Sequence, residues 1–263
     1  MADPLSPDAL LAALKAEGVK VVERDGWRTR NRDHKGKWGP VNGVMIHHTV
    51  TRGTEPTVKL CTDGHGDLPG PLCHAVIAKD GTVHLIGHGR ANHAGLGDPA
   101  VLVAVIGEAK LPKNQENKTD GNRHFYGFEC ENMGDGKDPW PAAQVDAIVR
   151  ASAALCRAHG WGTTGDTSVI GHSEWQVGKI DPKGPGITMA AVRTAVAARL
   201  ESPASAAPTQ PADTAPEFTV REGDTLGWIA EAYGTTTDAL RKLNPAIKDP
   251  DKLTPGQRIR LPG

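Results

Sequence analysis

Two short stretches of the sequence carry side chains that could bind a metal ion. The first, "VMIHHTV", places His47 and His48 next to each other among strand-forming residues, and neighbouring strand side chains point to opposite faces. The second, "VIGHSEWQVGKIDPKGPG", delivers a histidine, a lysine and a carboxylate from a strand end and a glycine-rich loop: His172, Lys179 and Asp181. Imidazole nitrogen and carboxylate oxygen are both zinc ligands, and a catalytic zinc typically takes three protein ligands. One histidine of the first stretch would complete this set.

Spacing alone leaves the zinc site open, because the chain has no HExxH helix and the ligands come from distant segments. A third stretch, "YGFECEN", carries two acids in a strand-like pattern. Alternation along a strand puts Glu129 and Glu131 on one face, opposite Phe128 and Cys130. A pair of acids on one strand is often the solvent-facing side of an edge strand.

The elements that must position these side chains alternate between strand and helix patterns. "SPDALLAALKAEG" predicts a helix with Ser6 as N-cap, Pro7 at the first helical position and Gly18 after the end. "VKVVERDGW", "GVMIHHTV", "CHAVIAKDGTVHLIG" and "HFYGFECEN" have β-like patterns, the third with a hairpin turn at Asp80-Gly81. "PAAQVDAIVRASAALCRAHG" and "TMAAVRTAVAARL" predict two further helices. We therefore expect an α/β fold with a central mixed β-sheet flanked by helices.

Composition divides the chain into two folded parts. Residues 201–216 are almost wholly Pro, Ala, Ser, Thr and acid, which cannot bury enough apolar surface to become ordered. We therefore predict a catalytic domain over 1–200, a linker over 201–216, and a small strand, helix, helix, strand (βααβ) module over 217–263. The polar stretch 107–123 fits neither period and is expected to be a surface insertion.

Charge and apolar content exclude several classes of protein. The 30 basic and 31 acidic residues give a net charge of −1, which provides no broad positive field for nucleic acid. No stretch approaches the ~20 apolar residues of a membrane span, and the start of the sequence lacks a secretory signal. We therefore expect no membrane insertion and a protein kept in the cytoplasm until it is released. Four cysteines without a CxxC pair predict free thiols, with a Cys61–Cys73 bridge as the alternative.

The order and spacing of the motifs resemble a known enzyme family. "GVMIHHTV", "CHAVIAKDGTVHLIG", "ANHAG", "YGFECEN" and "GHSEWQVGKIDPKGPG" are similar to the zinc-dependent N-acetylmuramoyl-L-alanine amidases shared by phage endolysins and peptidoglycan recognition proteins. The likeness covers roughly residues 20–195. It implies that His47, His172 and Asp181 hold the zinc. His48, on the opposite strand face, is then packed or supports a ligand.

The resemblance implies hydrolysis of the amide between the lactyl group of N-acetylmuramic acid and the L-alanine of the stem peptide. In this chemistry a zinc ion lowers the pKa of its bound water to roughly 7 and polarises the carbonyl. Lys179 matches a lysine that stabilises the oxyanion, and Glu129 matches an acid that is the general base in some members. Many members carry a tyrosine directly before the histidine equivalent to His74, where this chain has Cys73. His93, in "ANHAG", matches a cleft-lining position, so it contacts substrate or has a structural role.

The C-terminal stretch "FTVREGDTLGWIAEAYGTTTDALRKLNPAIKDPDKLTPGQRIRLP" resembles the LysM domain over its whole length. LysM modules bind N-acetylglucosamine-containing glycans in a shallow groove between two loops. The resemblance implies glycan contacts from Gly223, Asp224, Thr225, Leu226, Asn244, Pro245 and Ile247. For Leu226 and Ile247, packing in the core of the module is the alternative.

Together these features favour a phage endolysin, a monomeric peptidoglycan amidase that stays in the host cytoplasm until a holin releases it to the cell wall. A non-catalytic peptidoglycan recognition protein is one alternative. It is disfavoured because such relatives commonly lose a zinc ligand, whereas all three ligand residues occur here. A zinc peptidase that cleaves the stem peptide is the other alternative, since it would use the same metal on a different bond.

Overall fold

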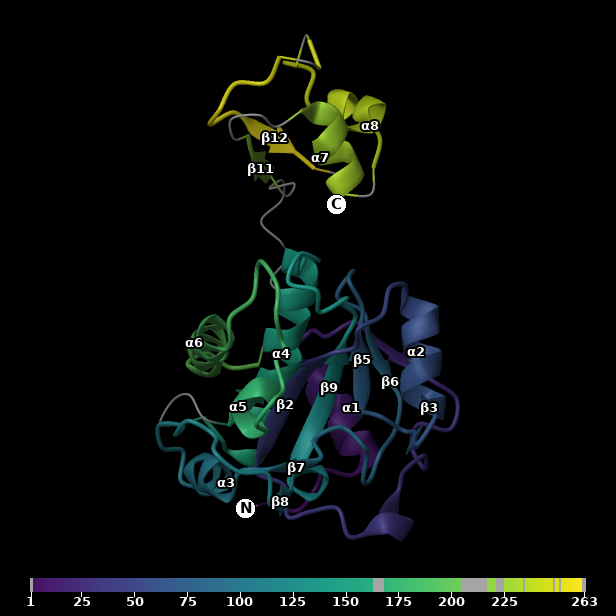
Figure 1. Cartoon of the computed structure of the whole chain (residues 1–263), viewed down its shortest axis with the longest axis vertical. Coiled ribbons are helices and arrows are strands. Elements are labelled where there is room, and N and C mark those ends of the chain that lie inside the picture. The colour runs from purple at the N-terminus through teal and green to yellow at the C-terminus, as the bar shows by residue number, and fades with distance from the viewer. Residues whose placement is uncertain are drawn as a thin grey trace. The chain divides into compact units, whose positions relative to one another are not determined.

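The chain divides into two compact units, Met1–Ala207 and Pro208–Gly263, which are described separately here (Figure 1). The computed structural model describes residues 2–162, 168–204, 217–220, 225–233, 235–247, 249–250 and 252–261. Most of the predicted linker therefore lies outside the described residues, and its extent stays a prediction.

The first unit is built on a six-stranded sheet with the order β1-β6-β5-β9-β2-β10. Its strands are β1 (Val21–Glu23), β2 (Gly43–His48), β5 (Ala75–Ile77), β6 (Val83–Leu85), β9 (Phe125–Cys130) and β10 (Val169–Gly171). All neighbours run parallel except β5 and β6, which are antiparallel. The predicted Asp80-Gly81 turn joins that hairpin, and Gly81 has a φ of 80°, which glycine adopts without strain. The expected mixed sheet is thus confirmed.

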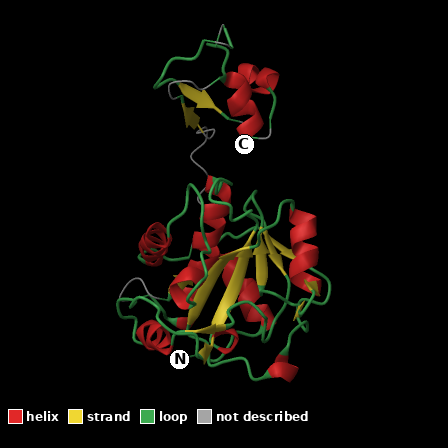
Figure 2. Cartoon of the chain, in the orientation of Figure 1, coloured by secondary structure: helices red, strands yellow, loops and turns green. Residues whose placement is uncertain are grey.

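Helices cover both faces of this sheet (Figure 2). The longer helices are α1 (Pro7–Ala16), α2 (Thr54–Asp63), α3 (Pro99–Ile106), α4 (Ala142–His159) and α6 (Met189–Leu200), and α5 (His172–Trp175) is a single turn. One face packs on α1, α4 and α6 in the main core, which includes Val44 and Ile46 of β2. The other face carries two smaller clusters, one with Met45, α3 and Trp175, and one with Val76 and α2.

Local sequence accounts for the predicted helices. The Ser6 hydroxyl accepts a hydrogen bond from the backbone N–H of Ala9 at the start of α1, as a capping residue should. Helix α4 ends at Gly160 with a φ of 69°, the left-handed conformation that favours glycine. Helices α2 and α3 were not among the elements predicted from the sequence. Their starts follow Gly53 and Asp98, and the Asp98 carboxylate caps α3 through the N–H of Ala100.

The prediction for the polar insertion is wrong in its last part. Residues 109–118 contain neither helix nor strand, as expected, but the end of the insertion forms β8 (Thr119–Asp120) and the short helix η2 (Gly121–Arg123). Strand β8 pairs with β7 (Leu96–Gly97), a contact between segments that periodicity cannot reveal. The remaining short elements of this unit are η1 (Asp33–Lys35), β3 (Gly64–His65) and β4 (Leu68–Pro69).

The second unit has the expected order of strand, helix, helix and strand. It consists of β11 (Glu217–Thr219), α7 (Leu226–Ala232), α8 (Thr237–Leu243) and β12 (Arg258–Arg260), and β11 pairs antiparallel with β12. Its core includes Ile229, Leu240 and Ile259. Across the described parts of both units, no helix combines the length and the apolar character required to cross a membrane.

Candidate metal centre

The three predicted ligands meet at one edge of the sheet. His47 lies near the end of β2, and His172 directly follows β10, the parallel neighbour of β2. The carboxyl ends of parallel strands lie at the same edge, where ligand sites of α/β sheets occur. The loop after α5 then returns Asp181 to this edge, where its main-chain oxygen accepts a hydrogen bond from the N–H of Ser173. Residues far apart in the sequence are therefore brought together by strand order and one short loop.

The ligand atoms form a nearly equilateral triangle. The distance from His47 Nδ1 to His172 Nδ1 is 3.0 Å, and each nitrogen lies 3.1 Å from the same oxygen, Asp181 Oδ2. A tetrahedral ion with bonds of about 2.1 Å would hold its ligands about 3.4 Å apart, close to these separations. All three residues are buried. The set of two nitrogens and one carboxylate oxygen therefore fits a single metal ion.

Electrostatics at the cluster also suit a cation. Burial and the nearby His172 lower the pKa of His47 to about 4, so its imidazole is neutral and can coordinate. Burial opposes ionisation of Asp181, but hydrogen bonds with His172 and His47 outweigh it and hold the pKa of Asp181 well below its usual range. A buried carboxylate beside the neutral His47 imidazole leaves a negative charge for a cation to compensate.

Glu129 lies beside the cluster on the adjacent strand β9. It is the register partner of His47, and its Oε1 is 4.0 Å from His47 Nδ1. Burial and the Asp181 carboxylate raise the pKa of Glu129 to about 8. Its Oε2 is buried and has no hydrogen-bond partner among the described residues. A buried carboxyl oxygen without a partner, beside the three candidate ligands, fits a site that a metal ion or a substrate group would complete.

The second acid of the stretch, Glu131, has a different environment. Its two oxygens accept hydrogen bonds from the backbone N–H of Gly53, at 2.7 Å, and the hydroxyl of Thr54, at 2.9 Å. These contacts hold the start of α2. The two acids of this stretch thus differ in their partners.

His48 and Lys179 occupy contrasting positions. His48 is 8% exposed on the opposite strand face, where its Nδ1 accepts a hydrogen bond from the backbone N–H of Lys183. Lys179 has an exposed side chain, and its charge partly opposes the raised pKa of Glu129. The loop that carries Lys179 is held by Asn117, whose amide oxygen accepts a 2.9 Å hydrogen bond from the N–H of Val177.

Two further side chains contact the candidate metal ligands. His93 is buried behind His47, and its Nδ1 lies 3.1 Å from His47 Nε2. Gln176, which is not among the predicted site residues, places its Oε1 2.9 Å from His172 Nε2. Its spacing of four residues from His172 was the only feature of the sequence that could have suggested this contact.

Cys73, in the position that is often tyrosine, is a buried free thiol, as are the other three cysteines. Tyr126 cannot replace that tyrosine, since it lies in the main core.

The predicted glycan contacts of the second unit are distributed over surface and core. Pro245 and Thr225 are exposed, whereas Leu226 and Ile247 are buried in the core, in agreement with the packing alternative. The Asn244 side chain donates to main-chain oxygens of Leu240 and Arg260 and accepts from the N–H of Arg260, so it joins α8 to β12. The other two predicted contacts, Gly223 and Asp224, lie outside the described residues.

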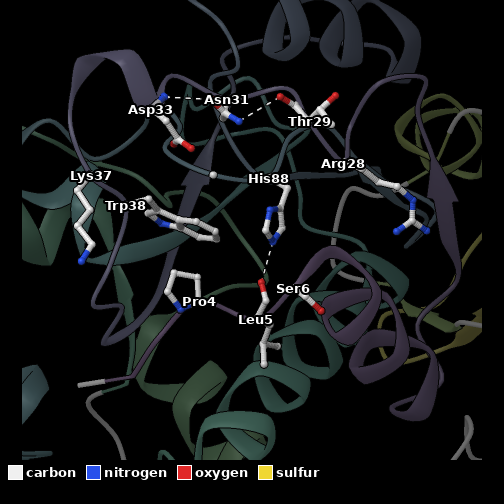
Figure 3. Close-up of a pocket in the computed structure, with 11 residues that line it drawn as sticks. Pro4, Leu5, Ser6, Arg28, Thr29, Asn31, Asp33, Lys37, Trp38 and His88 are labelled. Carbon is white, nitrogen blue, oxygen red and sulfur yellow. Dashed lines mark hydrogen bonds between the residues drawn. The ribbon is translucent and has the colours of Figure 1, made fainter.

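A separate cavity of about 620 Å³ lies near the N-terminal segment (Figure 3). Its lining includes Leu5, Lys37, Trp38 and His88, and it contains none of the predicted metal ligands. Two of the lining residues are joined directly, because His88 donates a 2.7 Å hydrogen bond to the main-chain oxygen of Leu5. This cavity is therefore distinct from the site formed by His47, His172 and Asp181.

Comparison with known proteins identifies two family matches. The family model of N-acetylmuramoyl-L-alanine amidases matches residues 37–184, and the LysM domain model matches residues 218–262. Over 145 residues the chain is 32% identical to the N-acetylmuramoyl-L-alanine amidase XlyB of Bacillus subtilis (strain 168), covering 54% of this chain and 44% of that protein. Over 48 residues it is 46% identical to the endolysin of Bacillus phage PZA, covering 18% of this chain and 19% of that protein.

These matches extend over less than half the length of either curated relative. Among solved structures, the N-acetylmuramoyl-L-alanine amidase LysC from Clostridium intestinale URNW is similar, with a TM-score of 0.45 and 17% identity. That similarity covers 66% of this chain and 95% of the other.

Proposed function

The chain belongs to the N-acetylmuramoyl-L-alanine amidase family, and on this premise we propose that it hydrolyses the amide bond between N-acetylmuramic acid and L-alanine in bacterial peptidoglycan. The observation that carries the proposal is the buried triangle of His47, His172 and Asp181, whose donor atoms suit a zinc ion. The same set counts against a purely recognising protein, which has no need of a metal site.

The residues around the cluster have separate roles in the proposed reaction. When bound, zinc lowers the pKa of a coordinated water and polarises the scissile carbonyl. A cation held by the three ligands would favour the ionised carboxylate of Glu129. In that form Glu129, the register partner of His47, would take the proton of the attacking water and return it to the leaving nitrogen of alanine. Lys179 offers its ammonium group to the oxygen that becomes negative as the carbonyl is attacked.

The experiment that tests this function is digestion of purified peptidoglycan followed by identification of the new chain ends. An amidase frees the lactyl carboxylate of muramic acid and exposes the amino group of L-alanine. New termini inside the stem peptide would identify a zinc peptidase instead. A zinc-loaded protein that binds peptidoglycan and releases no fragments would support the recognition alternative.

Lys179→Ala is expected to lower kcat by about 10²–10³ with unchanged metal content, because an oxyanion partner acts mainly in the transition state. Lys59→Ala is a matched control, since Lys59 pairs with Asp63 on α2 and has no place in the proposed reaction. The measurement is the turnover of a soluble muropeptide, with zinc content determined in parallel. Normal turnover of the Lys179 variant would remove Lys179 from the mechanism.

We further propose that the LysM module holds the enzyme on the glycan of the cell wall and that the protein acts as a monomeric endolysin, released from the host cytoplasm to the wall. The LysM match and the identity to a phage endolysin over 48 residues support this role. Exposed Pro245 and Thr225, together with Gly223 and Asp224, are the proposed glycan contacts.

A truncated protein ending at Pro203 is expected to cleave soluble muropeptides at close to the full-length rate but to lyse whole walls much more slowly. The physical reason is that tethering to the polymer raises the effective substrate concentration, whereas a soluble substrate gains nothing from it. Rates on both substrates test this, with sedimentation of residues 217–263 alone on peptidoglycan as the control. Loss of activity on soluble muropeptide would instead make the module part of the catalytic site.

A further inference from the structure

Both candidate metal-binding imidazoles have their second ring nitrogen occupied by a side chain. His47 Nε2 lies 3.1 Å from His93 Nδ1, and His172 Nε2 lies 2.9 Å from Gln176 Oε1. The other nitrogen of each ring, Nδ1, is the one that belongs to the ligand triangle. A neutral imidazole carries one proton. With a metal ion in the triangle, Asp181 Oδ2 would bind the ion instead of accepting from Nδ1, and an acceptor at Nε2 would then hold the proton away from the ligand atom.

The direction of the hydrogen bond between His47 and His93 follows from the second contact of His93, which is with a main-chain carbonyl. His93 Nε2 lies 3.3 Å from the main-chain oxygen of Phe125, which can only accept. His93 therefore carries its proton on Nε2, and its Nδ1 accepts from His47 Nε2–H. His47 Nδ1 is then left without a proton, on the side of the ring that faces the other two candidate ligands.

Gln176 places the proton of His172 on Nε2 in the same way, through one direct contact. An amide oxygen only accepts, so His172 donates through Nε2 and keeps a free lone pair on Nδ1. Gln176 is the residue after the short helix α5, and its backbone N–H donates to the main-chain oxygen of His172. The residue that orients this ligand is thus held by the same turn.

The position of His93 is built into the surrounding structure. The amide oxygen of Asn122 accepts hydrogen bonds from the backbone N–H groups of both His93 and Ala94, each at 2.8 Å. The ring lies directly on Gly127 of β9, where an added Cβ would be only 2.5 Å from His93 Cγ. These contacts hold the His93 ring behind His47 and away from solvent.

We propose that His93 and Gln176 are positioning residues that fix both metal-binding histidines in the tautomer with a free Nδ1. The proposal rests on the proposed function in that the cluster is taken to hold zinc. It also assigns His93 a role behind a ligand instead of a direct contact with substrate. Groups that orient a metal-binding imidazole typically change metal affinity by about 10–100-fold when they are removed.

The test is the zinc affinity of paired variants of the full chain, measured by competition with a chromogenic chelator. His93→Leu and Gln176→Leu remove the acceptor at similar volume and are expected to bind zinc about 10–100-fold more weakly. His93→Asn keeps an oxygen near the position of Nδ1, and Gln176→Glu keeps a carboxylate oxygen, so both should stay within a few-fold of the unmodified protein. Equal affinity of the leucine variants, or no rescue by the conservative pair, would overturn the proposal.

A second measurement needs no substitution and remains decisive if a leucine variant fails to fold. Long-range ¹H–¹⁵N spectra of the zinc-loaded protein report which nitrogen of each imidazole carries the proton. Protons on Nε2 of both His47 and His172 are expected. A proton on Nδ1 of either residue would refute the assignment for that residue. The proposed function fails separately, through absence of zinc binding or of amide cleavage in the unmodified protein.

Discussion

Replacing His47 by alanine is expected to leave the protein without bound metal and without lytic activity, whereas His48→Ala should retain one zinc per chain. The reason is geometric. His47 Nδ1 lies within 3.1 Å of both other ligand atoms, and His48 points to the other face of β2, where it accepts a hydrogen bond from the backbone of Lys183. The measurement is zinc content by atomic absorption, together with release of peptidoglycan fragments.

The same loss is expected for His172→Ala and Asp181→Ala, because three protein ligands are the usual minimum for a catalytic zinc. His48→Ala is the matched control, being the same substitution at the neighbouring residue. An inverted result, in which His48→Ala empties the site and His47→Ala does not, would show that the metal lies on the opposite face of the sheet.

Glu129→Gln is expected to lower kcat by about 10²–10⁴ while zinc remains bound, the range typical of a lost general base. Glutamine keeps the size of the side chain but cannot accept a proton at neutral pH. Glu129 is not one of the three ligands, so metal content should not change. Turnover of a soluble muropeptide and zinc content, measured on the same sample, test both parts of the expectation.

Glu131→Gln is the matched control, since it makes the same change two residues further along the chain. Glu131 holds Gly53 and Thr54 at the start of α2, so this variant should retain turnover and lose about 1–3 kcal/mol of stability. If both glutamine variants kept full turnover, the proton would have to be taken by another group. If only Glu131→Gln lost turnover, the assignment of the two acids would be reversed.

Candidate ligands could be predicted from the sequence because residue types and short-range patterns mark them, and the family resemblance selected His47, His172 and Asp181 among them. Strand alternation separates His47 from His48, since successive strand side chains must point to opposite faces. Ser6 and the Asp80-Gly81 turn also act within a few residues, through a cap and a favoured backbone conformation, and both features are present in the structure. Such signals do not require knowledge of which segments meet.

The partners within the site were decided only by the tertiary structure. His47 and Asp181 are 134 residues apart, and their contact depends on the order of β2 and β10 in the sheet. The register between β2 and β9 makes Glu129 the partner of His47, whereas the Glu131 carboxylate accepts a hydrogen bond at the start of α2. Strand order and register follow from the packing of the whole core, which no local pattern encodes.

The supporting residues illustrate the same limit. His93 matched a motif position that allowed either a substrate contact or a structural role, and its place behind His47 follows from contacts with Asn122 and Gly127. Leu226 could be a glycan contact or a core residue by sequence, and its 0% exposure places it in the core. The sequence by itself determined which groups could bind metal and move protons. The packed structure decided which of them touch, because burial and hydrogen-bond partners exist only after distant segments have come together.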